Sequence, residues 1–354
     1  MPDDLLPFES QADLPGVAFA AMRQIILGQA KASGLEVLED ADGRLTVRTA
    51  HGLIGLRPGG EAETAGMVAA RDPRWLYVMK GAVVQQMQHL MPEVAASMRW
   101  TDAEAAGSLP PNFRFATVAS VVPLGEAFLR VILKVEDLSS YGDDAIHFRL
   151  LQPPRTGEAA WPEVAENGAT RWPEGPGAPH KPVYTTRWAD HDEGLLATDV
   201  YVHEGGRTTD WARENLDEVE GRRRVVGLVG PSGGGLMHAD KVFMASDETG
   251  FPAVARLLEN LPAGARGEVL LEAEHGAACG YPVDPPRGVD LRWLSRSAGE
   301  RLAEAALAAL PRHDDAKIWF AGEREDARRL REAAKAAGRE AADLRISGFW
   351  RADA

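Results

Sequence analysis

The feature that most restricts the fold of this chain is a change in its hydrophobic pattern near residue 240. Before this point, short β-rich segments follow one another, separated by clusters of Asp, Gly and Pro. Such a series is typical of an antiparallel β-barrel. After this point, predicted strands alternate with predicted helices, which is typical of a parallel sheet covered by helices. The sequence therefore predicts a barrel followed by an α/β domain.

The predicted barrel strands are short and lie at 115–122, 128–135, 146–150, 183–188, 197–203 and 225–229. The α/β part is predicted to contain strands at 242–245, 269–273, 291–294 and 318–321 and helices at 252–260, 301–310 and 324–337. The segment 152–182 is rich in Pro, Gly and Trp. It is too long for an ordinary connection, so we expect either a functional loop or a mobile segment.

The N-terminal third predicts a small α+β domain of its own. A helix is expected over 17–32, followed by short strands at 35–38, 45–48 and 53–56, and residues 74–91 are interpreted as a strand at 75–78 and then a helix. Pro110-Pro111 is a plausible boundary, because proline disfavours helix before it. The predicted domains are 1–108, of unknown function, the barrel at 112–238 and the α/β domain at 239–354.

Composition excludes several classes of protein. The formal net charge of -14 argues against nucleic-acid binding, which needs a basic surface, although a local basic pocket can still bind an anion. A single cysteine, Cys279, leaves no internal disulfide and no CxxC site. No window reaches about 18 consecutive apolar residues, and the acidic start lacks a signal-peptide pattern. We therefore expect a soluble, cytoplasmic protein without a membrane span.

Several common chemistries lack their sequence signatures. The Gly-rich run at 230–235 has neither the Lys-Ser/Thr of a P-loop nor the spacing of a dinucleotide fingerprint. No two histidines have HxxxH or HExxH spacing. The sequence predicts no resident metal, and we assign no catalytic residue.

A Tyr-Thr-Thr-Arg run begins at Tyr184 on a predicted barrel strand. The tyrosine ring can pack against a flat ligand, and the hydroxyl of Thr185 can form hydrogen bonds. The guanidinium of Arg187 can hold a phosphate through its forked donors. The alternative interpretation is an ordinary strand that ends in a surface arginine.

A Gly-rich turn at Gly205-Gly206 precedes a helix that is expected to open at Thr208 or Thr209. The free N–H groups of a helix N-terminus can face an anion, such as a pyrophosphate. The alternative is a capped helix without a ligand.

Two further motifs lie in the α/β part. The run 245–253 follows a predicted strand, at the end where open α/β sheets bind ligands, although Thr249 can simply cap the next helix. Gly348-Phe349-Trp350-Arg351 places an aromatic pair near the C-terminus, either beside a stacked ligand or in a packed terminal strand.

These motifs share an order along the chain, at 183–187, 201–212, 230–235, 245–253 and 348–351. In this order they resemble the siderophore-interacting proteins, a family of the FAD-binding ferredoxin-reductase superfamily. The resemblance covers about residues 113–351. Residues 17–91 resemble a small uncharacterised domain sometimes joined to such proteins.

The resemblance implies a set of binding residues. For the cofactors it implies Tyr184, Thr185, Thr186, Arg187, His203, Thr208, Thr209, Trp211, Asp247, Glu248, Thr249, Ser295, Arg296 and Trp350. Ser295 and Arg296 follow a strand and resemble a 2′-phosphate site, which favours NADPH over NADH; the alternative is a surface arginine in a loop. Lys181 and Arg207 are candidates for an anionic ferric siderophore, and Arg222–Arg224 is a further basic candidate or a solvated turn.

The implied activity is FAD-dependent reduction of a ferric siderophore, with NADPH, NADH or a ferredoxin as the electron donor. A flavin suits this task because it accepts two electrons together and releases them singly. The family usually has an arginine where this chain has Pro182, and Lys181 can replace it only as a point charge. The alternatives are a general NAD(P)H:flavin oxidoreductase and a flavin-free protein that binds iron chelates.

Overall fold

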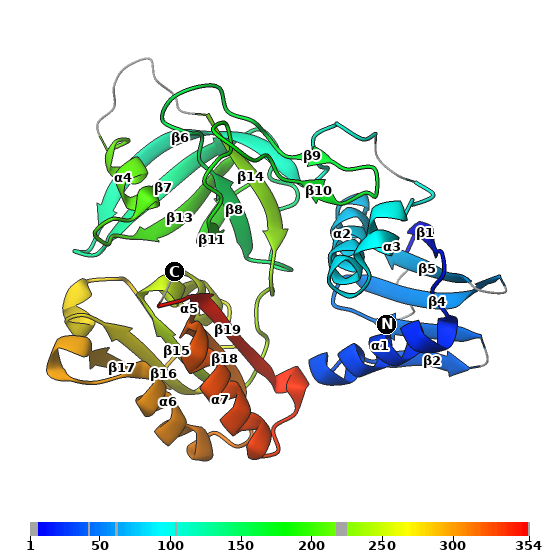
Figure 1. Ribbon diagram of the computed structural model, residues 1–354. Coiled ribbons are helices and arrows are strands. Elements are labelled where there is room, and N and C mark those ends of the chain that lie inside the picture. Colours follow the sequence, from blue (N-terminus) through cyan, green and yellow to red (C-terminus); the bar gives the residue numbers. More distant parts are fainter. Residues whose placement is uncertain (1–5, 42, 61–62, 103–104, 217–224, 353–354) are drawn as a thin grey trace. The chain divides into compact units, whose positions relative to one another are not determined.

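The computed structural model describes residues 6–41, 43–60, 63–102, 105–216 and 225–352 (Figure 1). It divides into two compact units. The first contains Met1–Phe113 and Pro153–Pro179, and the second contains Arg114–Gln152 and His180–Ala354. None of the helices in the described ranges combines the length and hydropathy that crossing a bilayer requires.

The first unit is built on an antiparallel sheet with the strand order β1-β5-β4-β3-β2. The strands are β1 (Phe8–Leu14), β2 (Val37–Ala41), β3 (Arg44–Arg48), β4 (Gly52–Gly60) and β5 (Glu63–Ala70), and the helices are α1 (Phe19–Ser33), α2 (Pro73–Leu90) and α3 (Pro92–Ser97). The predicted α+β character is confirmed. β1, β5 and α3 were not predicted.

The strand predicted at 75–78 is wrong, because these residues form the first turns of α2. Asp72 caps the helix by accepting a hydrogen bond from the backbone N–H of Trp75 at 2.8 Å, and Pro73 stands in its first turn. Both residues favour helix initiation. Trp75, Leu76 and Tyr77 are all buried, and three successive apolar residues resemble a short buried strand in the sequence.

The segment 153–179 forms a short hairpin of β9 (Glu163–Val164) and β10 (Thr170–Arg171) within the first unit. The backbone N–H of Gly107 donates to the carbonyl of Val164 at 2.9 Å, and the side-chain amide of Asn167 donates to the carbonyl of Ala95 at 2.9 Å. The hydroxyls of Tyr77 and Thr170 lie 2.9 Å apart. These contacts make the segment a structural part of this unit.

The second unit begins with the antiparallel barrel, in the order β11-β8-β14-β6-β7-β13-β12. Its strands are β6 (Phe113–Leu124), β7 (Phe128–Val135), β8 (His147–Leu151), β11 (Val183–Thr185), β12 (Trp188–Asp190), β13 (Leu195–Tyr201) and β14 (Val225–Ser232), and helix α4 spans Arg207–Arg213. The strand predicted at 183–188 is two strands, interrupted at Thr186-Arg187. Valines and leucines that point inward form its core.

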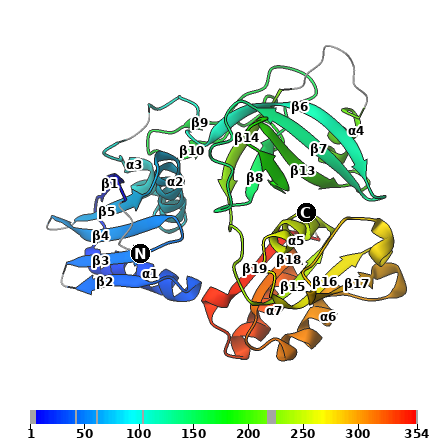
Figure 2. The ribbon, with the colours of Figure 1, turned by 180° about the vertical axis from the view of Figure 1, so that it is seen from behind.

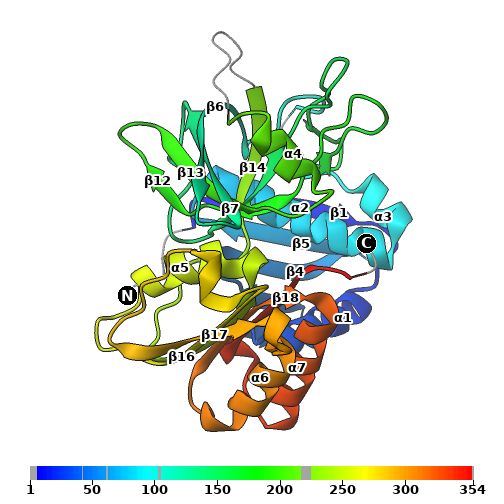
Figure 3. The ribbon, with the colours of Figure 1, turned by 90° about the vertical axis from the view of Figure 1, so that its left-hand side faces the viewer.

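The α/β domain contains a parallel sheet in the order β17-β16-β15-β18-β19. Its strands are β15 (Lys241–Asp247), β16 (Arg266–Ala273), β17 (Gly288–Ser295), β18 (Lys317–Glu323) and β19 (Leu344–Trp350), and its helices are α5 (Phe251–Glu259), α6 (Leu302–Ala309) and α7 (Arg324–Ala336). Helix α5 covers one face of the sheet, and α6 and α7 cover the other (Figures 2 and 3).

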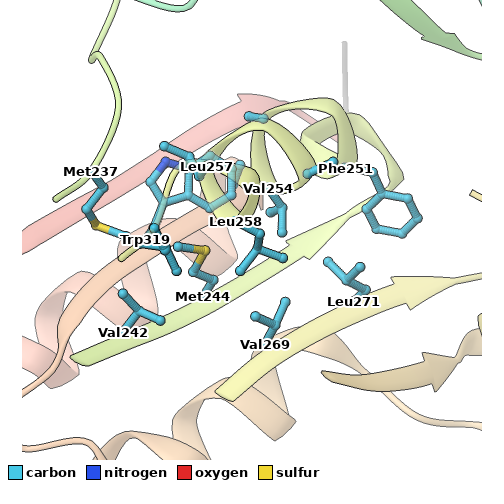
Figure 4. Close-up of a cluster of buried hydrophobic side chains, with 14 of the residues drawn as sticks. Met237, Val242, Met244, Phe251, Val254, Leu257, Leu258, Val269, Leu271 and Trp319 are labelled. Atoms are coloured by element: carbon cyan, nitrogen blue, oxygen red, sulfur yellow. The ribbon is translucent and has the colours of Figure 1, made fainter. Parts of the chain in front are cut away.

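Close packing fixes α5 on the sheet. Phe251, Val254 and Leu258 lie over Met244 and Val269 in a fully buried cluster (Figure 4). The N-terminal end of α5 thereby stands at the carboxyl end of β15, where parallel sheets bind their ligands. The predicted barrel and α/β domain are both confirmed, and the C-terminal aromatic pair lies at the end of the edge strand β19.

Candidate functional site

The Tyr-Thr-Thr-Arg run lies at the edge of the barrel sheet, where β11 pairs with β8. Burial raises the pKa of Tyr184 to about 12, and a hydrogen bond with Thr208 opposes the shift. The hydroxyl of Thr208 also accepts from the side-chain amide of Gln152 at 3.1 Å. The structure thus brings together two predicted residues, Tyr184 of β11 and Thr208 of α4, and places beside Thr208 a glutamine that was not predicted.

Thr185, on the same strand, contacts a histidine that was not predicted as part of the site, His147. Its hydroxyl lies 3.3 Å from Nδ1 of His147, and the ring of Phe349 meets the imidazole edge-on, with centroids 5.6 Å apart. Burial, followed by the charge of Arg256, lowers the pKa of His147 to about 4. The imidazole is therefore neutral at pH 7, and it lies between the barrel strand and the C-terminal strand β19.

The carboxyl end of β15 holds a buried acid. Asp247 accepts a hydrogen bond from the backbone N–H of Thr249 at 3.0 Å and from the indole N–H of Trp350 at 2.6 Å. Burial raises the pKa of Asp247 to about 6, although these hydrogen bonds oppose the shift. Thr249 is therefore part of the turn that follows β15. The predicted residues Asp247, Thr249 and Trp350 form one hydrogen-bonded cluster.

Arg187 has a different partner from the predicted phosphate. The guanidinium is buried and pairs with Glu259 at the end of α5, with Nη1 2.7 Å from Oε2. Burial lowers its pKa, but the pairing with Glu259 prevails and the pKa is raised overall. Beside it, Arg256 donates to the carbonyl of Thr186 at 2.5 Å and to Asp143 at 3.0 Å. Helix α5 therefore holds the turn between β11 and β12.

A buried triad forms a second link between the barrel and the α/β domain. Tyr281 donates to Oδ2 of Asp199 at 2.7 Å, and Arg130 donates to the other oxygen at 2.7 Å. Burial and the negative charge of Asp199 raise the pKa of Tyr281. The sequence offered no signal for this contact, because its members come from distant strands and a loop.

Arg296 lies after β17, as predicted, but within an acidic cluster. It donates to Glu248 at 2.8 Å and to Glu272 at 3.0 Å, and its Nε lies 3.4 Å from Glu274. Hydrogen bonding to Glu248 is the main cause that raises its pKa. The hydroxyl of Ser295 donates to the carbonyl of Glu274 at 3.2 Å. Three carboxylates disfavour a phosphate here, so the 2′-phosphate contact stays a prediction.

The residues around α4 are partly committed to the local turn. Thr209 accepts from the backbone N–H of His203 at 3.3 Å, and the ring of His203 is exposed and stacks on Tyr201 at 6.0 Å. Lys181 and Arg207 are both exposed. The pKa of His180 is lowered by burial and then by the positive charge of Arg207. The candidate Arg222–Arg224 lies outside the described residues.

Three buried polar atoms of the predicted group lack a hydrogen-bond partner among the described residues, namely Thr186 Oγ1, Arg187 Nε and Trp211 Nε1. A buried polar atom without a partner is costly unless a ligand or water completes it. In addition, Phe349 and Trp350 remain 38% and 45% exposed at the end of β19. Unsatisfied polar atoms and exposed aromatic rings beside a tyrosine-bearing strand fit a polar, flat cofactor such as FAD.

Comparisons with known proteins agree with this geometry. Residues 117–234 match the model of the siderophore-interacting FAD-binding domain, and residues 239–353 match that of the siderophore-interacting protein. The chain is 29% identical over 250 residues to the NADPH-dependent ferric-chelate reductase of Escherichia coli (strain K12), which covers 68% of this chain and 94% of that protein.

Two further proteins are similar to the same part. Ferric vibriobactin reductase ViuB of Vibrio cholerae serotype O1 is 30% identical over 188 residues, or 51% of this chain and 65% of that protein. The crystal structure of a siderophore utilization protein from T. fusca has 28% identity and a TM-score of 0.58, over 71% of this chain and 97% of that one. Since two models of one family match the barrel and the α/β domain in succession, this chain belongs to the siderophore-interacting protein family.

Proposed function

We propose that this protein is an FAD-dependent ferric-siderophore reductase that oxidises NADPH and reduces chelated Fe(III), so that iron is released as Fe(II). The observation that carries the proposal is the match of both domains of the family, in order, over residues 117–353. The names of the relatives agree, since one is an NADPH-dependent ferric-chelate reductase and another a ferric vibriobactin reductase.

The residues proposed to hold the flavin ring come from β11 and from the neighbouring end of the α/β domain. Tyr184 supplies a ring face, Thr185 and Thr186 supply hydroxyl groups, and Trp350 supplies an exposed indole. Bound FAD would supply the chemistry that couples a two-electron donor to a one-electron acceptor. The chain itself orients these groups: neutral His147 positions Thr185, and Asp247 positions Trp350.

The remaining predicted contacts belong to the ends of the cofactors and to the substrate. We propose Thr208, Thr209 and Trp211 for the pyrophosphate or adenine of FAD, and Glu248, Ser295 and Arg296 for the edge of the NADPH site. Lys181 and Arg207 are proposed to attract an anionic ferric chelate, because exposed cations raise the local concentration of anions on an acidic protein. Each NADPH supplies two electrons and therefore reduces two Fe(III).

The test begins with the absorbance spectrum of the purified protein, with and without added FAD. We expect flavin bands, and NADPH oxidation that is coupled to Fe(II) formation, followed with an Fe(II)-specific chelator. Ferric siderophore, ferric citrate and free flavin are compared as acceptors. A reaction with free flavin alone would assign the protein as a general flavin oxidoreductase. Activity with reduced ferredoxin but not with NADPH would replace the proposed donor.

A specific pair of observations favours a second candidate, a flavin-free protein that binds ferric chelates. Pro182 stands where the family usually has an arginine, and Arg187 is paired with Glu259. A colourless protein that rejects added FAD but binds a ferric siderophore would establish this candidate instead. For the reductase we propose the cytoplasm as the location, because the reaction draws on the cellular NADPH pool.

A further inference from the structure

The first unit contains an apolar pocket between its sheet and the two long helices. The pocket has a volume of about 240 Å³ and is lined from α1, β4, β5 and α2, and by Trp100. An engineered apolar cavity of about 150 Å³ is already large enough to bind benzene. The pocket is therefore large enough for a small organic molecule, and it lies in the part of the chain to which the proposed reaction assigns no role.

A glycine creates the open space at the floor of the pocket. Gly66 pairs with Ala12 and Leu56, and its neighbours on the same sheet face, Ile54 and Val68, line the pocket with it. A Cβ atom added at Gly66 would meet a single atom within 4 Å, the carbonyl oxygen of Ala12 at 3.7 Å. The space above this strand position is thus unfilled on the face that the helices cover.

The walls define the chemistry of the molecule that fits. Four of the lining residues are methionines, at positions 22, 67, 87 and 98. Methionine adapts to irregular apolar ligands because its side chain is unbranched and polarizable. Two partly buried amides, Gln29 on α1 and Gln86 on α2, also face the pocket, and neither makes a side-chain hydrogen bond within the described ranges. Among the residues that the structure describes, no lysine, arginine, aspartate or glutamate lines the pocket.

We propose that this pocket binds a small, uncharged and mostly apolar molecule that carries one or two polar atoms for the glutamine amides. A charged ligand would find no counter-charge in this lining, and burying an unpaired charge is costly. A protein segment does not fit either, because the space lies between the sheet and its covering helices. An empty apolar cavity lowers stability, so a ligand that fills it stabilises the fold.

The apolar group can come from two sources, either an independent metabolite or the hydrocarbon tail of a ferric chelate. Both present the same chemistry to the pocket, and the pocket does not depend on the flavin site. The binding measurement below uses the full chain without NADPH or iron, so its result is independent of the reductase activity.

The probe is N-phenyl-1-naphthylamine, an uncharged molecule whose fluorescence rises in apolar sites. We expect saturable binding to the full chain and an increase in melting temperature. Gly66→Leu places a side chain in the pocket and should weaken binding at least tenfold. Gly28→Leu is the matched control, because Gly28 is exposed on α1 and an added Cβ meets nothing within 4 Å. This variant should bind as the unmodified chain does.

A Gly66→Leu variant that keeps its melting temperature and also keeps full binding would overturn the proposal. If that variant fails to fold, Gln86→Leu provides the second test: it should retain the hydrocarbon probe and lose preference for decanol over decane. If the unmodified chain and Gln86→Leu prefer decanol over decane to the same degree, the proposed role of the glutamine amides in binding the polar atoms of the ligand is contradicted. Displacement of the probe by decanol supports an independent molecule, whereas displacement only by an acylated ferric chelate supports the substrate tail.

Discussion

At the scale of single residues, Asp247 predicts an unusual dependence of stability on pH. Its pKa of about 6, raised by burial, lies above that of the unfolded chain, so the native state binds an extra proton between about pH 4 and 6. Its contribution to stability therefore falls as the pH rises through this window. The asparagine of Asp247→Asn does not titrate. The free energy of unfolding of this variant, relative to that of the unmodified chain, should therefore be about 2 kcal/mol higher at pH 7 than at pH 4.5.

Urea unfolding of both proteins at the two pH values checks this expectation. Glu325→Gln, on the exposed side of α7, is the control. It should leave the change in unfolding free energy between the two pH values as it is in the unmodified chain, because the carboxylate of Glu325 is in water. A constant difference between Asp247→Asn and the unmodified chain at both pH values would contradict the buried, raised pKa.

The pKa of His147 is shifted in the opposite direction. Its pKa of about 4 lies below the ordinary value for histidine, because burial disfavours the imidazolium. The stability that it contributes is present above about pH 6.5 and is lost as the pH falls toward 4. An NMR titration of the histidine ring should show a neutral imidazole at pH 6. Arg256→Gln removes a nearby positive charge and should move this pKa upward, whereas titration near 6.5 in the unmodified chain would show that the ring is solvated.

At the scale of elements, the cluster around Arg296 predicts a large cost when its cation is removed. Glu248 and Glu272 are nearly buried, at 4% and 6% exposed, and both depend on this guanidinium. Removing one partner of a buried ion pair typically costs about 3–5 kcal/mol, because it leaves a buried charge uncompensated. Arg296 is partly exposed, so we expect the lower end of this range, about 3 kcal/mol, for Arg296→Gln.

The measurement is the denaturation midpoint of Arg296→Gln beside that of Arg328→Gln. Arg328 also contacts two glutamates, but on the exposed surface of α7, where ion pairs contribute little. Equal midpoints for the two variants would show that the Arg296 cluster is solvated. The ratio of NADPH to NADH activity in Arg296→Gln reports separately on the predicted 2′-phosphate contact.

The link between Arg187 and Glu259 predicts an effect on flavin affinity. If Arg187 binds the FAD phosphate, Glu259 competes for the same guanidinium, and Glu259→Gln should tighten FAD binding several-fold. Arg187→Lys should weaken binding, because an ammonium does not reproduce the planar fork. Fluorescence titration with FAD measures both. If the affinity for FAD is unchanged in both variants, Arg187 does not bind the cofactor, and its role is to hold β11 and β12 against α5.

The elements differ in how far the sequence predicted them. β7 was predicted over the residues that form it, 128–135, because branched residues and clear turns bound it. The start of α2 resembles a strand in the sequence, because Trp75, Leu76 and Tyr77 are apolar in succession, and the cap at Asp72 is the feature that indicates a helix. The Tyr-Thr-Thr-Arg motif is a local pattern, so the sequence alone is enough to single it out. His147, Gln152 and Glu259 were missed because only the tertiary fold brings them to the motif.

At the scale of the whole molecule, the first unit is discontinuous, and this predicts how the chain can be divided. Gln152 and His180 exchange backbone hydrogen bonds at 2.8 and 2.9 Å, so the two ends of the insertion 153–179 are adjacent. A two-residue Asn-Gly turn can therefore replace the insertion. A chain that lacks residues 1–113 and carries this turn should be monodisperse and keep its FAD binding.

The matched control lacks residues 1–113 but retains the insertion. It should aggregate, because it exposes the surface that Ala95, Gly107 and Tyr77 normally cover. Size-exclusion chromatography of the two chains separates the outcomes. If both are equally monodisperse, the insertion does not depend on the N-terminal unit.

The divided unit also has a consequence for synthesis on the ribosome. Residues 1–113 emerge first, but the hairpin that completes their unit is translated only after the first three barrel strands. At a translation rate of about 5–20 residues per second, several seconds pass between the synthesis of residues 1–113 and that of the hairpin that completes their unit. The order of translation thus couples the maturation of this unit to the early assembly of the barrel.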